Sequence, residues 1–174
     1  MLDAFAAPGG KTAYLTQLMG NEGTLIATDS LDKRLDRLRE NLQRLGVRRP
    51  MVRKAEWTEP QPDLELFDRI LLDVPCSNTG VLRRRVDLRW RLEPKVFAEM
   101  ADLQFKLATN VLKQLRPGGR AVYSTCSIEP EENEHLIDCL LEKDPTLERR
   151  GVVRSTPQTD GYDGAFATLL VKQT

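Results

Sequence analysis

The feature that most constrains the fold is an alternation along the chain between short apolar runs and longer amphipathic runs. The short runs have the length and the β-branched content of buried strands, whereas the longer runs repeat apolar residues at helical spacing. Strands that alternate with helices form a parallel sheet whose two faces are covered by the helices. The sequence therefore predicts an α/β fold built on a mostly parallel, twisted sheet.

The boundaries of the predicted elements follow from these runs and from the turn residues between them. Pro117-Gly118-Gly119 ends the longest helix, and a segment rich in Gly and Asp precedes the last strand, which is predicted to join antiparallel as an edge hairpin. Strands are predicted at residues 2–6, 24–29, 51–57, 69–74, 120–125 and 165–171. Helices are predicted at residues 11–19, 31–45, 94–115 and 130–142.

Length and composition limit the classes of protein that remain. The 174 residues are predicted to form one domain, residues 1–174. The 26 basic and 26 acidic residues cancel, so any contact with a nucleic acid must come from local clusters of charge. The sequence has neither an apolar run long enough to cross a bilayer nor a secretory signal at its start, and a cytoplasmic location is predicted.

The cysteines indicate free thiols. Three widely spaced cysteines, Cys76, Cys126 and Cys139, fit neither a disulfide framework nor a zinc site of paired CxxC ligands, so no metal is predicted. Cys139 lies on the apolar face of a predicted helix and is interpreted as a buried small hydrophobe.

The turn between the first strand and the first helix is a candidate ligand site. Gly10-Lys11-Thr12 looks like the end of a phosphate-binding loop, but Phe5 stands where that loop requires its first glycine, and no GxGxxG is present. Pro8 stiffens the turn, while Gly9 and Gly10 allow backbone to approach a ligand. The alternative is a turn that only connects a strand to a helix. Such a turn would account for the glycines but not for the carboxylate downstream.

Carboxylates end the next predicted strands. Asp29 lies about 20 residues after Gly9, where a carboxylate can accept both hydroxyl protons of a ribose, and an adenosine-bearing cofactor is therefore predicted. Glu56 is a candidate acceptor for an adenine amino group, with a solvated surface residue as the alternative. Asp73 ends an apolar run, where a carboxylate is costly without partners, and this favours a functional role.

Two thiols follow two predicted strands. Cys76 comes just after the strand at 69–74, and Cys126 just after the strand at 120–125. If these strands are neighbours, both thiols face one crevice at the carboxyl end of the sheet. Two cysteines at adjacent strand ends beside Asp73 indicate chemistry rather than inert packing.

A basic segment with one aromatic residue follows Cys76. Arginine binds phosphate and tryptophan stacks on an unpaired base, so the segment is a candidate RNA contact, with a solubilising surface loop as the alternative. The single histidine, His135, is interpreted as a helix-surface residue. The candidate RNA-binding residues are Arg83, Arg84, Arg85, Arg89 and Trp90.

Taken in order, these motifs resemble the RNA cytosine-5 methyltransferases of the RsmB/Sun (Fmu) family, and the resemblance covers essentially the whole chain as a catalytic domain. The closing Asp163-Gly164-Ala165-Phe166 is similar to the family's final hairpin. The matching segments are Ala6-Ala7-Pro8-Gly9-Gly10-Lys11-Thr12, Asp73-Val74-Pro75-Cys76-Ser77, Thr79-Gly80-Val81-Leu82-Arg83, Asp87-Leu88-Arg89-Trp90, Thr125-Cys126-Ser127 and Glu132-Asn133-Glu134.

The resemblance implies a Rossmann-like class I methyltransferase fold with an antiparallel last strand, S-adenosylmethionine as the methyl donor, and a cytosine in RNA as the acceptor, in 16S ribosomal RNA for RsmB-like members. It also implies the roles of the site residues. Asp29 would hold the ribose, Glu56 the adenine, and Asp73 would lie between donor and base. Cys126 would be the nucleophile and Cys76 would help to release the product. The donor would be cradled by Phe5, Ala6, Ala7, Pro8, Gly9, Gly10 and Lys11.

The implied chemistry explains the need for two thiols. Carbon 5 of cytosine is a poor nucleophile, so a thiolate must first add at carbon 6. Only the thiolate attacks, and Cys126 therefore needs help to ionise. The predicted helix at Pro130 favours ionisation through its dipole, whereas Glu129, Glu131 and Glu132 are expected to oppose it.

The chain also departs from the family pattern. Family members usually carry aspartate where Glu56 stands, and Ala165 replaces an expected aromatic residue. Because Met1 falls almost on the first strand, the family's upstream helices and N-terminal RNA-binding domain are expected to be missing, and a truncated catalytic domain with impaired RNA capture is one hypothesis. The alternatives are an inactive donor-binding module or a methyltransferase for another substrate, and neither would need the thiol pair.

Overall fold

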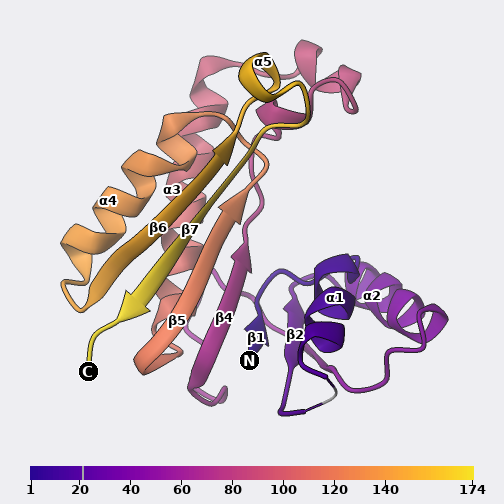
Figure 1. The fold of residues 1–174 in the computed structure, drawn as a ribbon. Coiled ribbons are helices and arrows are strands. Elements are labelled where there is room, and N and C mark those ends of the chain that lie inside the picture. The colour runs from indigo at the N-terminus through magenta and orange to yellow at the C-terminus, as the bar shows by residue number, and fades with distance from the viewer. Residues whose placement is uncertain (21) are drawn as a thin grey trace.

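A computed structural model describes residues 1–20 and 22–174 (Figure 1). Its seven-stranded sheet has the order β3-β2-β1-β4-β5-β7-β6. The strands are β1 (Leu2–Asp3), β2 (Ile26–Asp29), β3 (Met51–Lys54), β4 (Phe67–Asp73), β5 (Leu115–Thr125), β6 (Leu147–Ser155) and β7 (Ala165–Lys172). The helices are α1 (Gly10–Leu18), α2 (Asp32–Arg44), α3 (Pro94–Leu112), α4 (Glu134–Lys143) and α5 (Pro157–Asp160), with 3₁₀ helices η1 (Thr79–Val81), η2 (Val86–Trp90) and η3 (Pro130–Glu132).

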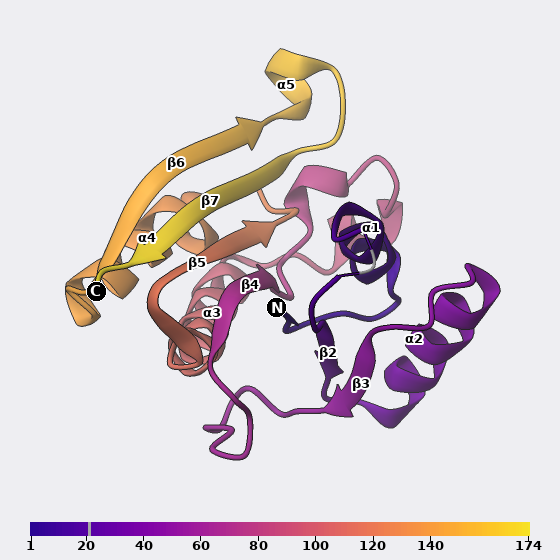
Figure 2. The same cartoon turned by 60° about the horizontal axis from the view of Figure 1, so that its bottom comes forward.

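The sheet is parallel from β3 through β5, and β7 then pairs antiparallel with both β5 and β6. This confirms the predicted mostly parallel sheet with an antiparallel last strand. The strand order reverses between β1 and β4, and such a switch point leaves a crevice at the carboxyl ends of the strands. Figure 2 shows α2 beside β2 and β3 at one edge and the hairpin of β6 and β7 at the other.

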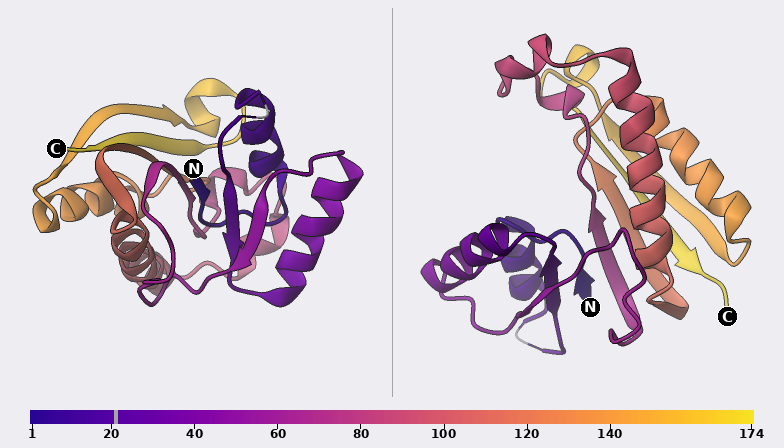
Figure 3. Two further views of the ribbon diagram at one scale, coloured as in Figure 1. Left: turned by 90° about the horizontal axis from the view of Figure 1, so that it is seen from below. Right: turned by 180° about the vertical axis from the view of Figure 1, so that it is seen from behind.

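Helices cover both faces of the sheet, as predicted. The larger core packs α3 and α4 against one face, and Figure 3 shows these two helices lying along β4, β5 and β7. The smaller core packs α2 and part of α1 on the other face. Ile26 belongs to the first core and its neighbour Ala27 to the second, because successive strand residues point to opposite faces.

Several predicted boundaries move. The first strand ends at Asp3 rather than at residue 6, yet the turn stays attached to both neighbours: the Ala4 N–H donates to Leu71 O (3.0 Å) and the Ala6 N–H to Thr28 O (2.9 Å). The long helix ends at Leu112, and β5 begins at Leu115. The predicted helix at 130–142 is divided into η3 and α4.

The prediction omitted β6 altogether. Its residues are mostly exposed, four of the nine are charged, and Val152 and Val153 are adjacent rather than alternating, so the period that marks a strand is missing. The pairing with β7 at the sheet edge defines this strand instead.

The interpretation of Cys139 as a buried hydrophobe is wrong, because its side chain is exposed. The buried residues of α4 are Leu136, Ile137 and Leu140, and Cys139 falls beside that stripe rather than in it. His135 is exposed, as predicted. None of the helices in the described part of the chain is long and apolar enough to cross a membrane.

Candidate active site

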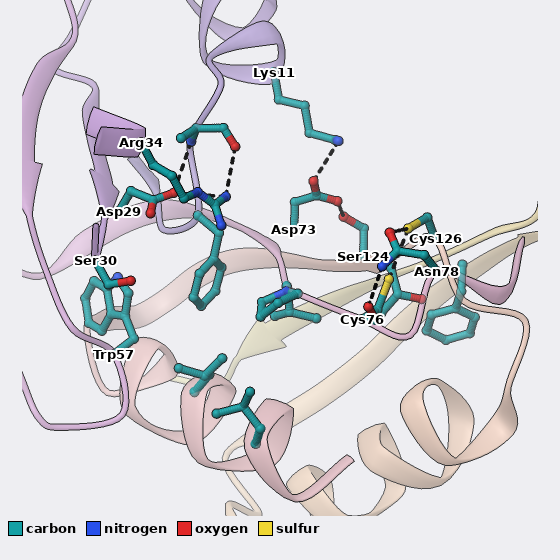
Figure 4. Close-up of a pocket in the computed structure, with 18 of the residues that line it drawn as sticks. Lys11, Asp29, Ser30, Arg34, Trp57, Asp73, Cys76, Asn78, Ser124 and Cys126 are labelled. Carbon is teal, nitrogen blue, oxygen red and sulfur yellow. Dashed lines mark hydrogen bonds and ion pairs between the residues drawn. The ribbon is translucent and has the colours of Figure 1, made fainter. Parts of the chain in front are cut away.

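A cavity of about 760 Å³ lies at the carboxyl ends of the central strands (Figure 4). This volume is typical of a pocket for a cofactor-sized ligand. The cavity runs from the glycine turn before α1 to the segments that follow β4 and β5, so it joins the two halves of the predicted site. Its polar lining includes Lys11, Asp29, Ser30, Arg34, Glu56, Asp73, Cys76, Asn78, Arg85, Ser124 and Cys126.

The glycine turn forms one wall of the cavity. Phe5, Ala7 and Lys11 line it, whereas the other predicted turn residues, Ala6, Pro8, Gly9 and Gly10, shape the turn without lining the cavity. Gly9 has φ +107°, and a Cβ built on it would lie 2.8 Å from Leu38 Cδ1. A side chain at this position would meet both the strained backbone and the packed helix α2.

Asp29 ends β2 and is only 4% exposed, yet it borders the cavity. Its Oδ2 accepts the Ala7 N–H (3.4 Å) and pairs with Arg34 Nη2 (3.2 Å). Arg34 also donates to Ala7 O (3.1 Å). Asp29 therefore anchors the glycine turn in addition to facing the place predicted for a ribose.

Glu56 also borders the cavity, but its side chain is exposed. Its Oε1 accepts the backbone N–H of Thr58 (3.2 Å) and the Thr58 hydroxyl (3.1 Å). These bonds hold the turn that follows β3. Its contact with an adenine stays a prediction.

Asp3 is a buried carboxylate beneath the turn that sequence reasoning missed. The Thr12 hydroxyl donates to its Oδ2 (2.7 Å), while Oδ1 has no hydrogen-bond partner among the described residues. Burial raises the pKa of Asp3 to about 6, and the nearby Asp73 acts in the same direction. The available signal was an acidic residue within the apolar run predicted as the first strand.

Asp73 lies between the glycine turn and the thiols. Its Oδ2 pairs with Lys11 Nζ (2.7 Å), and its Oδ1 accepts the Ser124 hydroxyl (2.8 Å). These partners come from α1 and β5, so the carboxylate links the two halves of the cavity. The sequence identified Asp73 and Lys11 but not Ser124.

Cys76 and Cys126 converge on the same cavity, and their Sγ atoms lie 3.0 Å apart. The pairing of β4 with β5 brings the two cysteines together, as the sequence predicted for neighbouring strands. Asn78, which the sequence reasoning missed, accepts the Cys126 thiol at Oδ1 (3.0 Å) and donates from Nδ2 to Cys76 O (2.6 Å).

The two thiols are electrostatically unequal. The hydrogen bond from Cys76 lowers the pKa of Cys126, with Arg85 acting in the same direction while burial and Asp73 oppose it. The pKa of Cys76 is raised, first by its bond to Cys126 and then by burial. Cys126 is thus the thiol that ionises more readily, and Cys76 holds its proton.

The basic segment after Cys76 is only partly helical: Arg83, Arg84 and Arg85 lie in the turn between η1 and η2, whereas Arg89 and Trp90 belong to η2. Arg83 and Arg84 pair with Asp163 at 2.5 and 2.6 Å, which ties this segment to the approach to β7. Arg85 lines the cavity, and Trp90 is 90% exposed. Of the predicted RNA-binding residues, Arg85, Arg89 and Trp90 have no ion-pair or cation–π partner among the described residues.

This sheet, with its cavity at the switch point, defines the class as a Rossmann-like methyltransferase fold. An rRNA methylase from Streptococcus thermophilus that is only 15% identical to this chain still superimposes on 99% of it with a TM-score of 0.63, which supports the fold alone. The family model described as 16S rRNA methyltransferase RsmB/F matches residues 1–171. The chain belongs to this RsmB/F family.

Curated relatives and solved structures agree with that assignment. Ribosomal RNA small subunit methyltransferase B of Salmonella arizonae is 38% identical over 185 residues, covering 99% of this chain and 42% of the relative. The protein of the same name from Vibrio cholerae is 39% identical over 180 residues, covering 99% and 41%. The structure of NSun6 from Pyrococcus horikoshii with SFG is 33% identical, with a TM-score of 0.90, over 99% of this chain and 47% of that one. The chain thus spans less than half the length of these proteins.

Proposed function

We propose that this chain transfers a methyl group from S-adenosylmethionine to carbon 5 of a cytosine in RNA, with 16S ribosomal RNA as the substrate. The observation that carries the proposal is the pair of unequal thiols, 3.0 Å apart, in the cavity that the glycine turn also lines. Family membership and the names of the relatives, which are ribosomal RNA small subunit methyltransferases, support it.

The cavity suits an adenosine-bearing donor. A Cβ built on Gly10 would meet nothing within 4 Å, so no protein atom covers the turn at this point, next to Phe5, Ala7 and Lys11, which line the cavity. Asp29 is fixed at the end of β2, where it can accept ribose hydroxyls, and Glu56 borders the same region. When bound, S-adenosylmethionine supplies an electrophilic methyl group on a sulfonium.

Cys126 is proposed as the nucleophile because its pKa is the one that is lowered. Its thiolate adds to carbon 6 of the cytosine, which makes carbon 5 electron-rich. Asp73, oriented by Lys11 and Ser124, is proposed to meet the N3 edge of the base after taking up a proton, so that it donates a hydrogen bond to N3 and stabilises the negative charge that the addition creates.

Cys76 is proposed to complete the reaction. Its pKa is raised first by the hydrogen bond to Cys126, and that bond is lost once the Cys126 sulfur is bonded to carbon 6. Freed from this bond, Cys76 is proposed to lose its own proton to solvent and, as a thiolate, to take the proton from carbon 5. Loss of that proton expels Cys126 and restores the aromatic base.

RNA contact is proposed at the segment after Cys76. Arg85 and Arg89 can bind phosphate, and the exposed ring of Trp90 can stack on an unpaired base. The target cytosine must leave its stack to reach thiols inside a cavity.

The test is a methyl-transfer screen with donor labelled in its methyl group, offered 16S rRNA, DNA and protein. The proposal predicts label on carbon 5 of cytosine in the RNA, and no transfer by the Cys126→Ala variant. Donor binding without transfer to any acceptor would favour an inactive donor-binding module. Transfer that persists in Cys126→Ala would favour a methyltransferase for another substrate.

A further inference from the structure

Glu132 is a buried carboxylate that the proposed reaction does not use. Its side chain is fully buried, and no lysine, arginine or histidine within residues 1–20 and 22–174 forms an ion pair with it. A buried carboxylate is costly unless hydrogen bonds satisfy its oxygens. The partners that satisfy it are therefore informative.

Those partners are the residues that follow the two reactive cysteines. Oε1 of Glu132 accepts the hydroxyls of Ser77 and Ser127, the latter at 2.7 Å. Oε2 accepts the Ser77 N–H at 2.9 Å. Ser77 directly follows Cys76, and Ser127 directly follows Cys126. One carboxylate therefore accepts hydrogen bonds from both cysteine-bearing turns.

Residues of helix α3 and strand β5 donate further hydrogen bonds to Glu132. Gln104 Nε2 donates to Glu132 Oε2 (2.8 Å) and to Pro75 O (2.8 Å), on the other side of Cys76. The Tyr123 hydroxyl donates to the backbone O of Glu132 (2.8 Å). Burial, followed by the charge of Glu132, raises the pKa of Tyr123, so this phenol stays a donor.

The next residue continues the same arrangement. Asn133 Oδ1 accepts the Thr125 hydroxyl (2.6 Å), and its Nδ2 donates to Ser127 O (3.0 Å). The turn that carries Cys126 is thereby fixed on both sides of the cysteine. The division between η3 and α4, which the sequence did not predict, falls at Asn133.

We propose that Glu132 is a positioning residue that clamps the two cysteine-bearing turns and so sets the distance between the Cys76 and Cys126 sulfurs. It acts through Ser77 and Ser127 and touches no reacting atom. The causes that raise the pKa of Cys126 are burial and Asp73, and the expected opposition from Glu132 is not among them. Its importance for methyl transfer rests on the proposed function, whereas the clamp itself does not.

Two substitutions separate geometry from charge. In Glu132→Gln the amide oxygen can still accept the Ser77 N–H and the Gln104 amide. The amide nitrogen can donate to the two serine hydroxyls, which can rotate to accept because a hydroxyl both donates and accepts. Glu132→Gln therefore removes the charge but preserves the clamp, while Glu132→Ala removes both. Leu140→Ala, which truncates a buried side chain in α4, is the matched control for destabilisation alone.

The measurement is the effective molarity of the thiol pair, obtained at equilibrium with glutathione. Oxidised glutathione takes two electrons from Cys76 and Cys126, which join as a disulfide, and leaves as two molecules of reduced glutathione. A Cys139→Ser background removes the exposed third thiol. The assay needs neither donor nor RNA, so it can fail while the proposed function stands, and the reverse also holds.

The clamp predicts that Glu132→Ala lowers this effective molarity by about tenfold or more, while Glu132→Gln and Leu140→Ala stay within about twofold of the parent. Kinetically, Glu132→Ala should lower kcat and leave the Kd for S-adenosylhomocysteine unchanged. An unchanged effective molarity in Glu132→Ala overturns the proposal. So does an equal fall of the effective molarity in Leu140→Ala or Glu132→Gln. If Glu132→Ala does not fold, Ser77→Ala replaces it. An unchanged effective molarity of the thiol pair in Ser77→Ala also overturns the proposal.

Discussion

Removing the Cys76 thiol should make Cys126 harder to ionise. The Cys76 Sγ lies 3.0 Å from the Cys126 Sγ, and its hydrogen bond is the first cause of the lowered pKa of Cys126. A hydrogen bond to a charged acceptor contributes about 1.5–3 kcal/mol, and one pKa unit corresponds to about 1.36 kcal/mol. Because a thiol is a weak donor, the lower end applies, and Cys76→Ala should raise the pKa of Cys126 and lower its thiolate fraction about tenfold at a pH below that pKa.

The assay is the pH dependence of iodoacetamide alkylation at Cys126, followed by peptide mass spectrometry in the Cys139→Ser background. At a pH below the pKa of Cys126 in both proteins, the smaller thiolate fraction means an alkylation rate about tenfold lower in Cys76→Ala. Two control variants should move the pKa in known directions. Arg85→Ala should raise it, because a favourable positive charge is lost, and Asp73→Asn should lower it, because an opposing negative charge is lost.

An unchanged or lowered pKa of Cys126 in Cys76→Ala would refute this reasoning. In that case burial and the two neighbouring charges would have to account for the ionisation of Cys126. The division of roles between the thiols would then lose its electrostatic basis.

Two further predictions concern the glycine turn and the acid beneath it. Gly9→Ala should destabilise the fold by about 1–3 kcal/mol, because φ is +107° and the new Cβ meets Leu38. Gly10→Ala should leave the melting temperature unchanged, because a Cβ there meets nothing within 4 Å, but it should weaken the binding of S-adenosylhomocysteine measured by calorimetry. A stable Gly9→Ala would contradict the strain argument. Since burial raises the pKa of Asp3 in the fold above its unfolded value of 3.8 to about 6, stability should fall as pH rises between these values and level off above them. Relative to Asp3→Asn, the wild type should lose up to about 3 kcal/mol over that range in denaturant titrations, and a constant difference would contradict the shift.

The sequence could predict what depends on local pattern. Alternating strands and helices predicted the sheet, and residues at strand ends, such as Asp29, Asp73 and Cys126, could be placed in one crevice because parallel strands align their carboxyl ends. The convergence of Cys76 with Cys126 needed only the pairing of β4 with β5.

The parts that sequence could not predict depend on contacts between distant segments. β6 has no alternating pattern and exists through its pairing with β7. The sequence places Glu132 in a family motif but cannot show its contact with Ser77, which only the fold creates. Cys139 is exposed because α4 turns Leu136 and Leu140 inward. Asn78 has a left-handed backbone (φ 63°) that its turn alone does not dictate, and that conformation accompanies its contact with Cys126.

The measurement that most directly tests the central claim is the fate of the covalent link between protein and RNA. Cys76→Ala, incubated with 16S rRNA and donor, should accumulate a protein–RNA adduct that survives a denaturing gel, because the proton on carbon 5 is not removed. Cys126→Ala should form none. An adduct in Cys126→Ala, or its absence from a folded Cys76→Ala that binds RNA, would contradict the assignment of the two thiols.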